Sequence, residues 1–302
     1  MTTDTKTKAL VQRSAESTMT VRDLKWNVYV PIGISVTLLM VFYSLIFRSW
    51  YGNWMMNESY YSHGILVPFI SLFIVWLKKK DLAEVPVRPS AVGYFILVPL
   101  LALVSIMLMA GSNTAGGLAF PLIVASMVLI LFGWQMLRET AFPIGYLYFM
   151  CVLPGFLLVK LSFTIQIVST MVATVLLHLI GLDAYRTGVM ISLPNIEVMV
   201  GAPCSGFRLL ISLLAFAVLF AYLREGPLWG RLFLVAFTAP LSLIVNSLRI
   251  AMIALVGEYM GSDTMHSFHD YSGYIVLVLA FIILWFISRL VKCQKFNSKL
   301  IP

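Results

Sequence analysis

A series of long apolar runs constrains the fold of this chain more than any other feature. These runs cover residues 28–47, 60–77, 91–110, 117–134, 207–223, 232–256 and 271–290. A helix needs about 20 mostly apolar residues to cross a bilayer, and most of the runs are close to that length. The chain has 60% hydrophobic and only 11% charged residues, which leaves too few polar side chains to cover a soluble core. The sequence therefore predicts an all-α polytopic membrane protein.

The stretch from Ala141 to Ile180 is also apolar, but Pro154, Gly155 and Lys160 interrupt it. It holds either one span with a re-entrant or interfacial segment, or two spans broken at these residues. One span is the economical choice. Residues 141–160 are then the re-entrant or interfacial segment.

Basic residues predict how the spans are oriented, because cytoplasmic loops of membrane proteins are rich in Lys and Arg. The residues behind the net charge of +8 lie mostly in the first 25 positions, at Lys78–Lys80 and in the last 15 positions, which indicates orientation and not nucleic-acid binding. Cytoplasmic loops are further marked by Arg88, Arg138, Arg224 and Arg231. The loop 181–203 must then lie outside. We expect about eight transmembrane helices with both termini cytoplasmic.

These boundaries predict a simple domain organisation. Residues 1–26 form a cytoplasmic N-terminal tail, residues 27–291 a single transmembrane domain, and residues 292–302 a basic cytoplasmic tail. The N-terminal tail does not have the pattern of a cleaved signal peptide, because its apolar run starts late and no small-residue cleavage site follows. The first span is expected to remain as an anchor.

Three polar groups that are costly in a membrane protein fall near the outer face in this topology. Cys204 lies at the outer end of the sixth span and His269 at the outer end of the eighth. Arg249 lies in the seventh, on the order of 12 Å below an outer end near Gly257 at 1.5 Å per residue. His269 shares the predicted loop 257–270 with His266. We expect Cys204, Arg249 and His269 to meet in one outer pocket.

Cys204 is the candidate nucleophile. Pro203, Ser205 and Gly206 flank it where a polar loop meets an apolar run, and the thiolate is favoured at a helix N-terminus or beside a cation. Gly206 leaves room for a substrate backbone to approach. Of the other cysteines, Cys151 lies in an apolar stretch and Cys293 in the basic tail, so no disulfide partner is expected. The alternative is a small buried filler residue.

Arg249 is expensive within an apolar span and calls for a partner. Asn246 lies on the same helical face three residues earlier and could hold the guanidinium group. Arg249 could stabilise the oxyanion that forms when a thiolate attacks a peptide carbonyl. A structural ion pair or an interfacial anchor is the alternative.

His269 is the candidate general acid and base, and Gly273 keeps the helical face beside the imidazole open. An interfacial histidine at a helix cap is the alternative, and either His266 or His269 could be the idle one. A zinc site made of Cys204, His266 and His269 lacks the usual ligand spacing. We therefore predict no metal and no cofactor.

Four short motifs together resemble those of the exosortases, bacterial membrane enzymes analogous in chemistry to the soluble sortases. They are Tyr-Ser-His-Gly at Tyr61–Gly64, Pro-Cys-Ser-Gly at Pro203–Gly206, Asn-Ser-Leu-Arg-Ile at Asn246–Ile250 and His-Asp-Tyr-Ser-Gly at His269–Gly273. Their order and spacing extend over nearly the whole chain, and they are specific only as a set. His63 belongs to the first motif, where it could line the path of the substrate or cap a helix.

The resemblance implies a Cys-Arg-His transpeptidase of the cysteine protease class in the bacterial inner membrane, with its active site facing the periplasm. Its substrates would be exported proteins with a C-terminal sorting tail: a Pro-Glu-Pro-like motif, a membrane helix and a basic cluster. Cys204 would form an acyl-thioester, Arg249 would stabilise the transition state and His269 would move the proton. The acyl group would pass to a surface acceptor, in a pathway associated with exopolysaccharide production. The extra extracytoplasmic domain of some exosortases is not expected here, so any accessory partner would be a separate protein.

Two other functions remain open. A multi-span transporter would bind its substrate near the bilayer midplane, usually between broken helices and inverted repeats. A lipid-linked glycan transferase would want acidic pairs at the outer face, where the acidic residues are scattered. In either case, and in a noncatalytic scaffold, Cys204 has no catalytic role.

Overall fold

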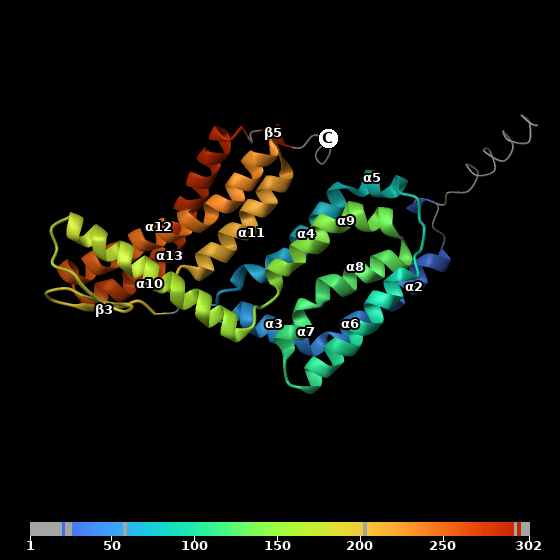
Figure 1. Cartoon of the computed structure of the whole chain (residues 1–302), viewed down its shortest axis with the longest axis horizontal. Coiled ribbons are helices and arrows are strands. Elements are labelled where there is room, and N and C mark those ends of the chain that lie inside the picture. Colours follow the sequence, from blue (N-terminus) through green and yellow to red (C-terminus); the bar gives the residue numbers. More distant parts are fainter. Residues whose placement is uncertain (1–19, 22–25, 57–58, 202–203, 293–294, 297–302) are drawn as a thin grey trace, which may run out of the picture. The chain divides into compact units, whose positions relative to one another are not determined.

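The computed structural model describes residues 20–21, 26–56, 59–201, 204–292 and 295–296 (Figure 1). The chain divides into two compact units. The first contains residues 1–51 and 65–152, and the second contains residues 52–64 and 153–302. Most of the predicted tails, together with Glu58, Pro203 and Cys293, lie outside the described residues.

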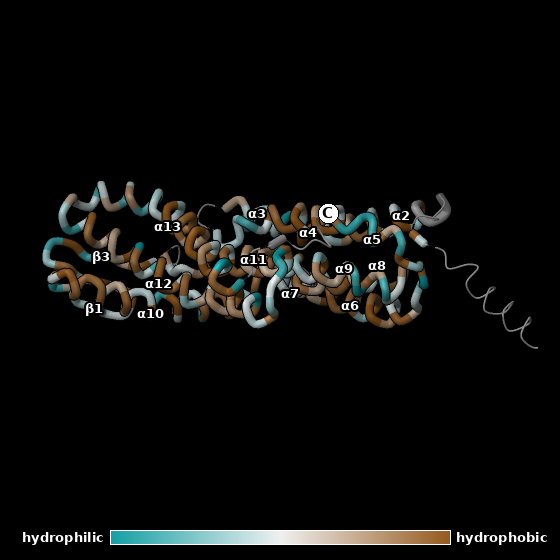
Figure 2. Tube along the Cα trace, turned by 90° about the horizontal axis from the view of Figure 1, so that it is seen from above, coloured by the Kyte–Doolittle hydropathy of each residue, from teal (hydrophilic) through white to brown (hydrophobic). Residues whose placement is uncertain are grey.

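The named elements of the first unit are all helices. It begins with α2 (Trp26–Phe42) and most of α3 (Ser44–Met55), which meet at a bend of 63°. The remaining elements are α4 (Leu66–Leu77), α5 (Lys79–Glu84), α6 (Val92–Met109), α7 (Asn113–Leu118), α8 (Phe120–Leu131), α9 (Trp134–Tyr146) and the 3-10 turn η3 (Leu147–Met150). Figure 2 shows apolar residues along most of α6 and polar residues at α5.

Contacts at two levels fix how α8 and α9 run in this unit. Lys78, which follows α4, bonds to Glu139 in the middle of α9. At the other level, the Cys151 thiol lies 3.5 Å from the backbone oxygen of Gly117, just before α8. Since α8 packs against α9, and α4 packs against both α9 and η3, the segment 133–151 runs back over the depth that α8 covers.

The second unit contains the long helices of the chain. Its elements are the end of α3, η2 (Ser62–Ile65), α10 (Gly155–Leu179), β1 (Tyr185–Thr187), β2 (Met190–Ser192), β3 (Glu197–Met199), α11 (Phe207–Leu223), β4 (Arg224–Glu225), α12 (Leu228–Met260), α13 (Ser262–Leu290) and β5 (Lys295–Phe296). Strands β1, β2 and β3 form an antiparallel sheet in that order, with Ile191 facing Arg186 on one side and Val198 on the other. The sequence did not predict these strands.

Two apolar cores lie along the second unit. One joins α11, α12 and α13 through residues such as Leu213, Leu241 and Ala280. The other joins the sheet and α10 to the C-terminal part of α12, through residues such as Ile191, Leu177 and Ala254, and it includes Cys204. Cys204 therefore belongs to the core around the sheet and lies just before α11, a helix of the other core.

Gly261 separates α12 from α13. Its φ of +85° lies in the left-handed region, which glycine adopts without strain. The chain reverses there, and α13 packs along α12. This reversal returns His269 to the level of Arg249. The histidines are on a helix, so the predicted loop 257–270 was wrong: α12 continues to Met260 and α13 begins at Ser262.

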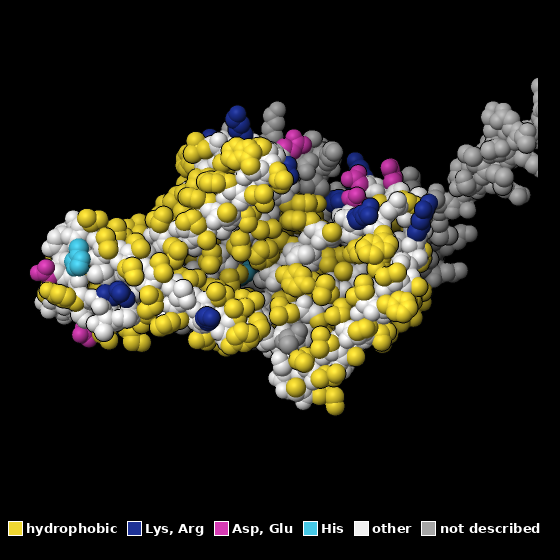
Figure 3. Space-filling view, viewed as in Figure 1, with side chains coloured by type: hydrophobic (Ala, Val, Ile, Leu, Met, Phe, Trp, Pro, Cys, Tyr) yellow, Lys and Arg dark blue, Asp and Glu magenta, His cyan; other side chains and the backbone are white. Residues whose placement is uncertain are grey.

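Four helices among the described residues are long and apolar enough to cross a membrane: α6, α10, α12 and α13. The bent pair of α2 and α3 makes a fifth if it counts as one span, and Ser62–Leu77, Gly116–Leu131 and Phe207–Leu223 are shorter apolar helices. Apolar side chains also cover much of the visible surface over the helices (Figure 3). The fold is that of a helical polytopic membrane protein, while eight spans with cytoplasmic termini stay a prediction.

Candidate functional site

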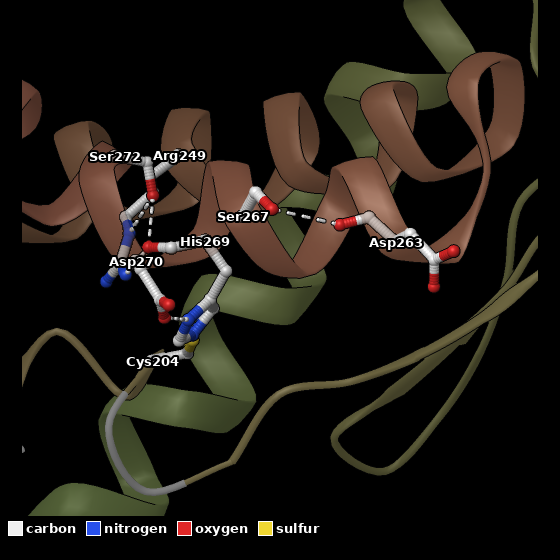
Figure 4. Close-up of polar contacts among 7 residues, drawn as sticks. All are labelled: Cys204, Arg249, Asp263, Ser267, His269, Asp270 and Ser272. Atoms are coloured by element: carbon white, nitrogen blue, oxygen red, sulfur yellow. Dashed lines mark hydrogen bonds and ion pairs between the residues drawn. The ribbon is translucent and has the colours of Figure 1, made fainter.

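The structure brings Cys204 and His269 together. The Cys204 thiol bonds to Nε2 of the His269 imidazole, although 65 positions separate the two residues (Figure 4). Cys204 lies just before α11, and His269 lies two turns into α13. A thiol and an imidazole in contact can exchange a proton, which is the arrangement that activates a cysteine nucleophile.

The loop that carries Cys204 is held from α12. The Asn246 side-chain amide donates to the backbone oxygen of Cys204 over 3.0 Å. Asn246 is 1% exposed, so this hydrogen bond is shielded from water. Ser205 is fully buried, and its hydroxyl accepts from the Phe207 backbone N–H at the start of α11. Asn246 and Ser205 therefore both position the loop.

Arg249 is held by α13. Its Nε donates to the Ser272 hydroxyl over 2.9 Å, and a terminal nitrogen donates to the His269 backbone oxygen over 3.0 Å (Figure 4). Asn246 donates its side-chain amide to the Cys204 loop, and the expectation that it also holds the guanidinium stays a prediction. The positive charge of Arg249 is thereby held against the backbone of His269.

The opposite ring nitrogen of His269 faces a carboxylate. Nδ1 of His269 lies 3.3 Å from Oδ1 of Asp270, whose side chain is 76% exposed. A carboxylate on one ring nitrogen orients the imidazole and favours a proton there, so that the other nitrogen can accept one. Sequence reasoning did not assign Asp270 a role. Its position directly after His269 was the only signal.

A cleft of about 570 Å³ opens beside these groups. The polar residues that line it include Arg208, Asn246, Arg249, His269 and Asp270. Apolar residues that line it include Trp54, Met55, Met56, Leu209 and Tyr274. Cys204 itself is 8% exposed and is not among the lining residues. Its thiol contacts His269, which does line the cleft. The cleft is large enough for a short extended segment of polypeptide.

His63 lies beside the cleft and not in it. Its Nδ1 is 3.2 Å from the Ser212 hydroxyl on α11, and Ser212 and Ser62 both line the cleft. His63 thus supports the cleft wall through Ser212. A direct site role for His63 stays a prediction.

The structure distinguishes the two candidate histidines. His266 is exposed, and it is not among the residues that line the cleft. No group of three or more His, Cys, Asp or Glu residues that could hold a metal ion is found in the described part of the chain. Of the two histidines, only His269 is paired with Cys204.

Alanine is expected to be tolerated at Gly273 but not at Gly206. Gly206 has a φ of +77°, and an added Cβ would lie 2.8 Å from the Asn246 side chain. An added Cβ at Gly273 would lie 3.6 Å from Arg249, an ordinary contact, and a helical position favours alanine. We expect Gly206→Ala to lower the free energy of unfolding by about 1–3 kcal/mol and Gly273→Ala to leave it nearly unchanged. Thermal unfolding of both purified variants in detergent checks this, and equal midpoints would contradict it.

The fold and the site together define a class. The chain is a polytopic helical membrane protein in which a cysteine and a histidine meet at the N-terminal end of an apolar helix. A model of the transmembrane exosortase family (Exosortase_EpsH) matches residues 54–286, and the chain belongs to this family. The match covers well over half of the chain and every candidate site residue. Family membership implies a membrane cysteine transpeptidase or protease.

No curated protein and no solved structure matches the chain.

Proposed function

We propose that this protein removes the C-terminal sorting tail of exported proteins at the outer face of the bacterial inner membrane, and passes the shortened protein to a surface acceptor. The substrate tail would consist of a Pro-Glu-Pro-like motif, one membrane helix and a basic cluster. The observation that carries the proposal is the contact between the Cys204 thiol and the His269 imidazole, in a member of the exosortase family.

The first half of the reaction forms a thioester. His269 Nε2 takes the thiol proton of Cys204, and the sulfur attacks the carbonyl carbon of the peptide bond to be cut. The negative charge on the carbonyl oxygen is stabilised by Arg249, whose guanidinium group lines the same cleft. His269 then gives the proton to the leaving nitrogen, the C–N bond breaks, and the tail departs with a new amino terminus.

The second half releases the substrate. A nucleophile with an O–H or N–H bond enters the cleft and loses its proton to His269 while it attacks the thioester carbon. The C–S bond breaks and the thiol of Cys204 is restored. Water as the nucleophile gives hydrolysis, whereas a hydroxyl or amine on a surface molecule gives transfer.

The proposal includes a topology of eight spans with both termini in the cytoplasm. The lysines and arginines of α5, β4 and the C-terminal end of α13 support it, since they mark cytoplasmic loops. Cys204 and His269 then face the periplasm, where the tail of an exported protein becomes accessible after secretion.

Co-expression with a tagged reporter tests this function. The reporter is a secreted protein with an epitope tag before a Pro-Glu-Pro-type tail, and its size is followed by immunoblot with and without the enzyme. We expect the shorter form only when the enzyme and the complete tail are both present. Equal processing of a reporter without the Pro-Glu-Pro motif would contradict the proposed substrate class.

The charge of the cleft predicts how the tail is bound. Arg208 and Arg249 line the cleft against a single carboxylate, Asp270, so its net charge favours an anionic segment. The Arg249 side chain is held by α13, whereas no hydrogen bond or ion pair of the Arg208 side chain occurs among the described residues. Guanidinium groups bind carboxylates in a forked geometry, so we propose that Arg208 contacts the acidic residue of the tail.

We expect Arg208→Glu to slow processing by roughly tenfold or more, since hydrogen bonds to charged groups contribute about 1.5–3 kcal/mol. A lysine in place of the glutamate of the reporter motif should restore part of the rate. Arg186→Glu is the matched control, because Arg186 lies exposed on β1 and donates to its own loop at Gly188. Equal effects of the two charge reversals on the processing rate would exclude a specific contact at Arg208.

A further inference from the structure

The surface of α10 is inverted compared with a helix of a soluble protein. Its buried residues are mostly small or polar: Ser162, Gln166, Ser169, Thr170, Ala173 and Thr174. Most of its exposed residues are large and apolar, and they include Phe156, Val159, Phe163, Met171, Val175 and Leu179. Lys160, Thr164 and His178 are exposed as well. Small and polar residues between helices, with apolar residues facing outward, are typical of a helix in contact with lipid. The exposed face of α10 therefore fits acyl chains and not water.

Length and composition alone would make α10 a spanning helix. The contacts of the first unit indicate otherwise, because they place the crossing at α9 and η3, before α10 begins. Glu139, the sixth residue of α9, bonds to Lys78, in the loop that the Lys78–Lys80 cluster marks as cytoplasmic. The Cys151 thiol after η3 bonds to the backbone oxygen of Gly117, which lies in α7 just before the N-terminal end of α8. The chain thus reaches the outer side at Cys151, four residues before α10.

The loop after α10 also lies outside. Residues 181–201 lead to Cys204, whose helix α11 runs inward to Arg224 at a cytoplasmic loop. A helix that begins and ends on the same side of the bilayer does not cross it. We predicted one crossing within 141–180, with 141–160 as the re-entrant or interfacial segment. The present assignment reverses this: α9 and η3 make the crossing, α10 does not, and the total of eight spans is kept.

The contacts of α10 in the second unit agree with this assignment. Near its start, the Ser162 hydroxyl lies 3.0 Å from the Tyr60 hydroxyl, and the Tyr60 ring packs on Phe207 at the start of α11. Farther along, Ala173 and Leu177 share a core with Ile253 of α12. Figure 1 shows α10 running beside α12. Thus α10 starts at the level of the site and continues along the part of α12 that lies beyond Arg249.

The length of α12 leaves room for such an arrangement. It has 33 residues and is about 50 Å long at 1.5 Å per residue, whereas the hydrocarbon core of a bilayer is about 30 Å thick. The part from Arg231 to Arg249 alone is about 27 Å long. The part that follows Arg249, against which α10 packs, therefore begins at the outer edge of the hydrocarbon core and is not needed for the crossing.

We propose that α10 lies along the outer leaflet with both ends outside, its apolar face resting on lipid acyl chains beside the catalytic cleft, and that α9 with η3 makes the crossing. The occupant of the exposed face is membrane lipid. This inference concerns topology and does not depend on the proposed reaction.

Cysteine accessibility in the full-length protein tests the position of the α10 N-terminus. Gly155→Cys suits this test, since Gly155 is exposed and an added Cβ meets nothing within 4 Å. Asp183→Cys serves as the outer control and Lys80→Cys as the inner control, both at exposed positions. The background variant carries Cys204→Ser and Cys293→Ser, and it retains the buried Cys151.

We expect a membrane-impermeant maleimide to label Gly155→Cys in intact cells as it labels Asp183→Cys. Lys80→Cys should be labelled only after permeabilisation. If Gly155→Cys instead behaves like Lys80→Cys, α10 crosses the bilayer and the inference is overturned. Immunoblots of the membrane fraction confirm that each variant is present at an equal level.

Lipid contact needs a second measurement. Val159→Cys, Met171→Cys and Leu179→Cys, each labelled with a small fluorophore, are reconstituted in bilayers that carry a quencher either near the headgroups or near the chain ends. We expect all three positions to be quenched more strongly by the shallow quencher. Strongest quenching of position 171 by the deep quencher, as in a spanning helix, would overturn the proposal. So would the absence of quenching by either lipid.

Discussion

Replacing Cys204 with alanine is expected to abolish removal of the reporter tail, with a loss of rate of at least about a thousandfold. Without the sulfur no thioester can form, and His269, which contacts the thiol, has no proton to accept from it. The methyl group of alanine is smaller than the thiol and fits the buried site, so the level of enzyme in the membrane should stay unchanged. The immunoblot of the reporter measures this loss.

Cys293→Ala is the matched control for that experiment, because it removes a thiol in the C-terminal tail, remote in sequence from Cys204. It should process the reporter at the wild-type rate. Undiminished processing by Cys204→Ala would remove the basis of the thiol mechanism and return the transporter, glycan transferase and scaffold functions to consideration.

The second large effect is expected for His269→Ala. In the proposed mechanism the imidazole both takes the thiol proton and returns it to the leaving nitrogen, and removing such a group from a catalytic pair costs about a thousandfold or more. His266→Ala offers a close control, since His266 lies one turn earlier on α13, is exposed and does not line the cleft. It should retain nearly the full rate.

The two large effects should not add. Residues that act as one unit in a reaction lose most of the catalysis when either is removed, so Cys204→Ala combined with His269→Ala should be no slower than Cys204→Ala alone. If the loss of rate in the double variant equals the product of the two single losses, the residues act independently. That result would contradict a catalytic pair of Cys204 and His269.

Much of the membrane fold follows from the apolar runs, because hydropathy reports burial in lipid directly. The ends of the helices do not follow from it. The first two turns of α13, from Ser262 to His269, are as polar as a loop, and the sequence placed His266 and His269 in a loop for that reason. In the structure these turns pack along α12, and this packing places His269 against Cys204.

Cys204, Arg249 and His269 could be singled out from sequence because each is costly or unusual where it lies. Their contacts could not. Whether Asn246 faces Arg249 or the Cys204 loop depends on how α11, α12 and α13 cross, which is a matter of tertiary packing. Asp270 and Arg208 were missed for a similar reason, since charged residues near a membrane surface are common and only their place beside the cleft marks them.

The fold of residues 181–201 lay equally beyond reach. Strands β1 to β3 are each three residues long, too short for an alternating pattern to be recognised. Their buried residues Ile191 and Val198 become meaningful only through the core that they share with α10 and α12.

The central claim is that Cys204 carries the substrate as a thioester, and trapping that species tests it most directly. The enzyme and reporter are quenched in acid during processing, and the peptide that contains Cys204 is analysed by mass spectrometry with and without hydroxylamine, which cleaves thioesters. We predict an adduct of the shortened reporter on Cys204 that hydroxylamine releases and that Cys204→Ala lacks. An adduct on another residue, or normal tail removal by Cys204→Ala, would contradict the account.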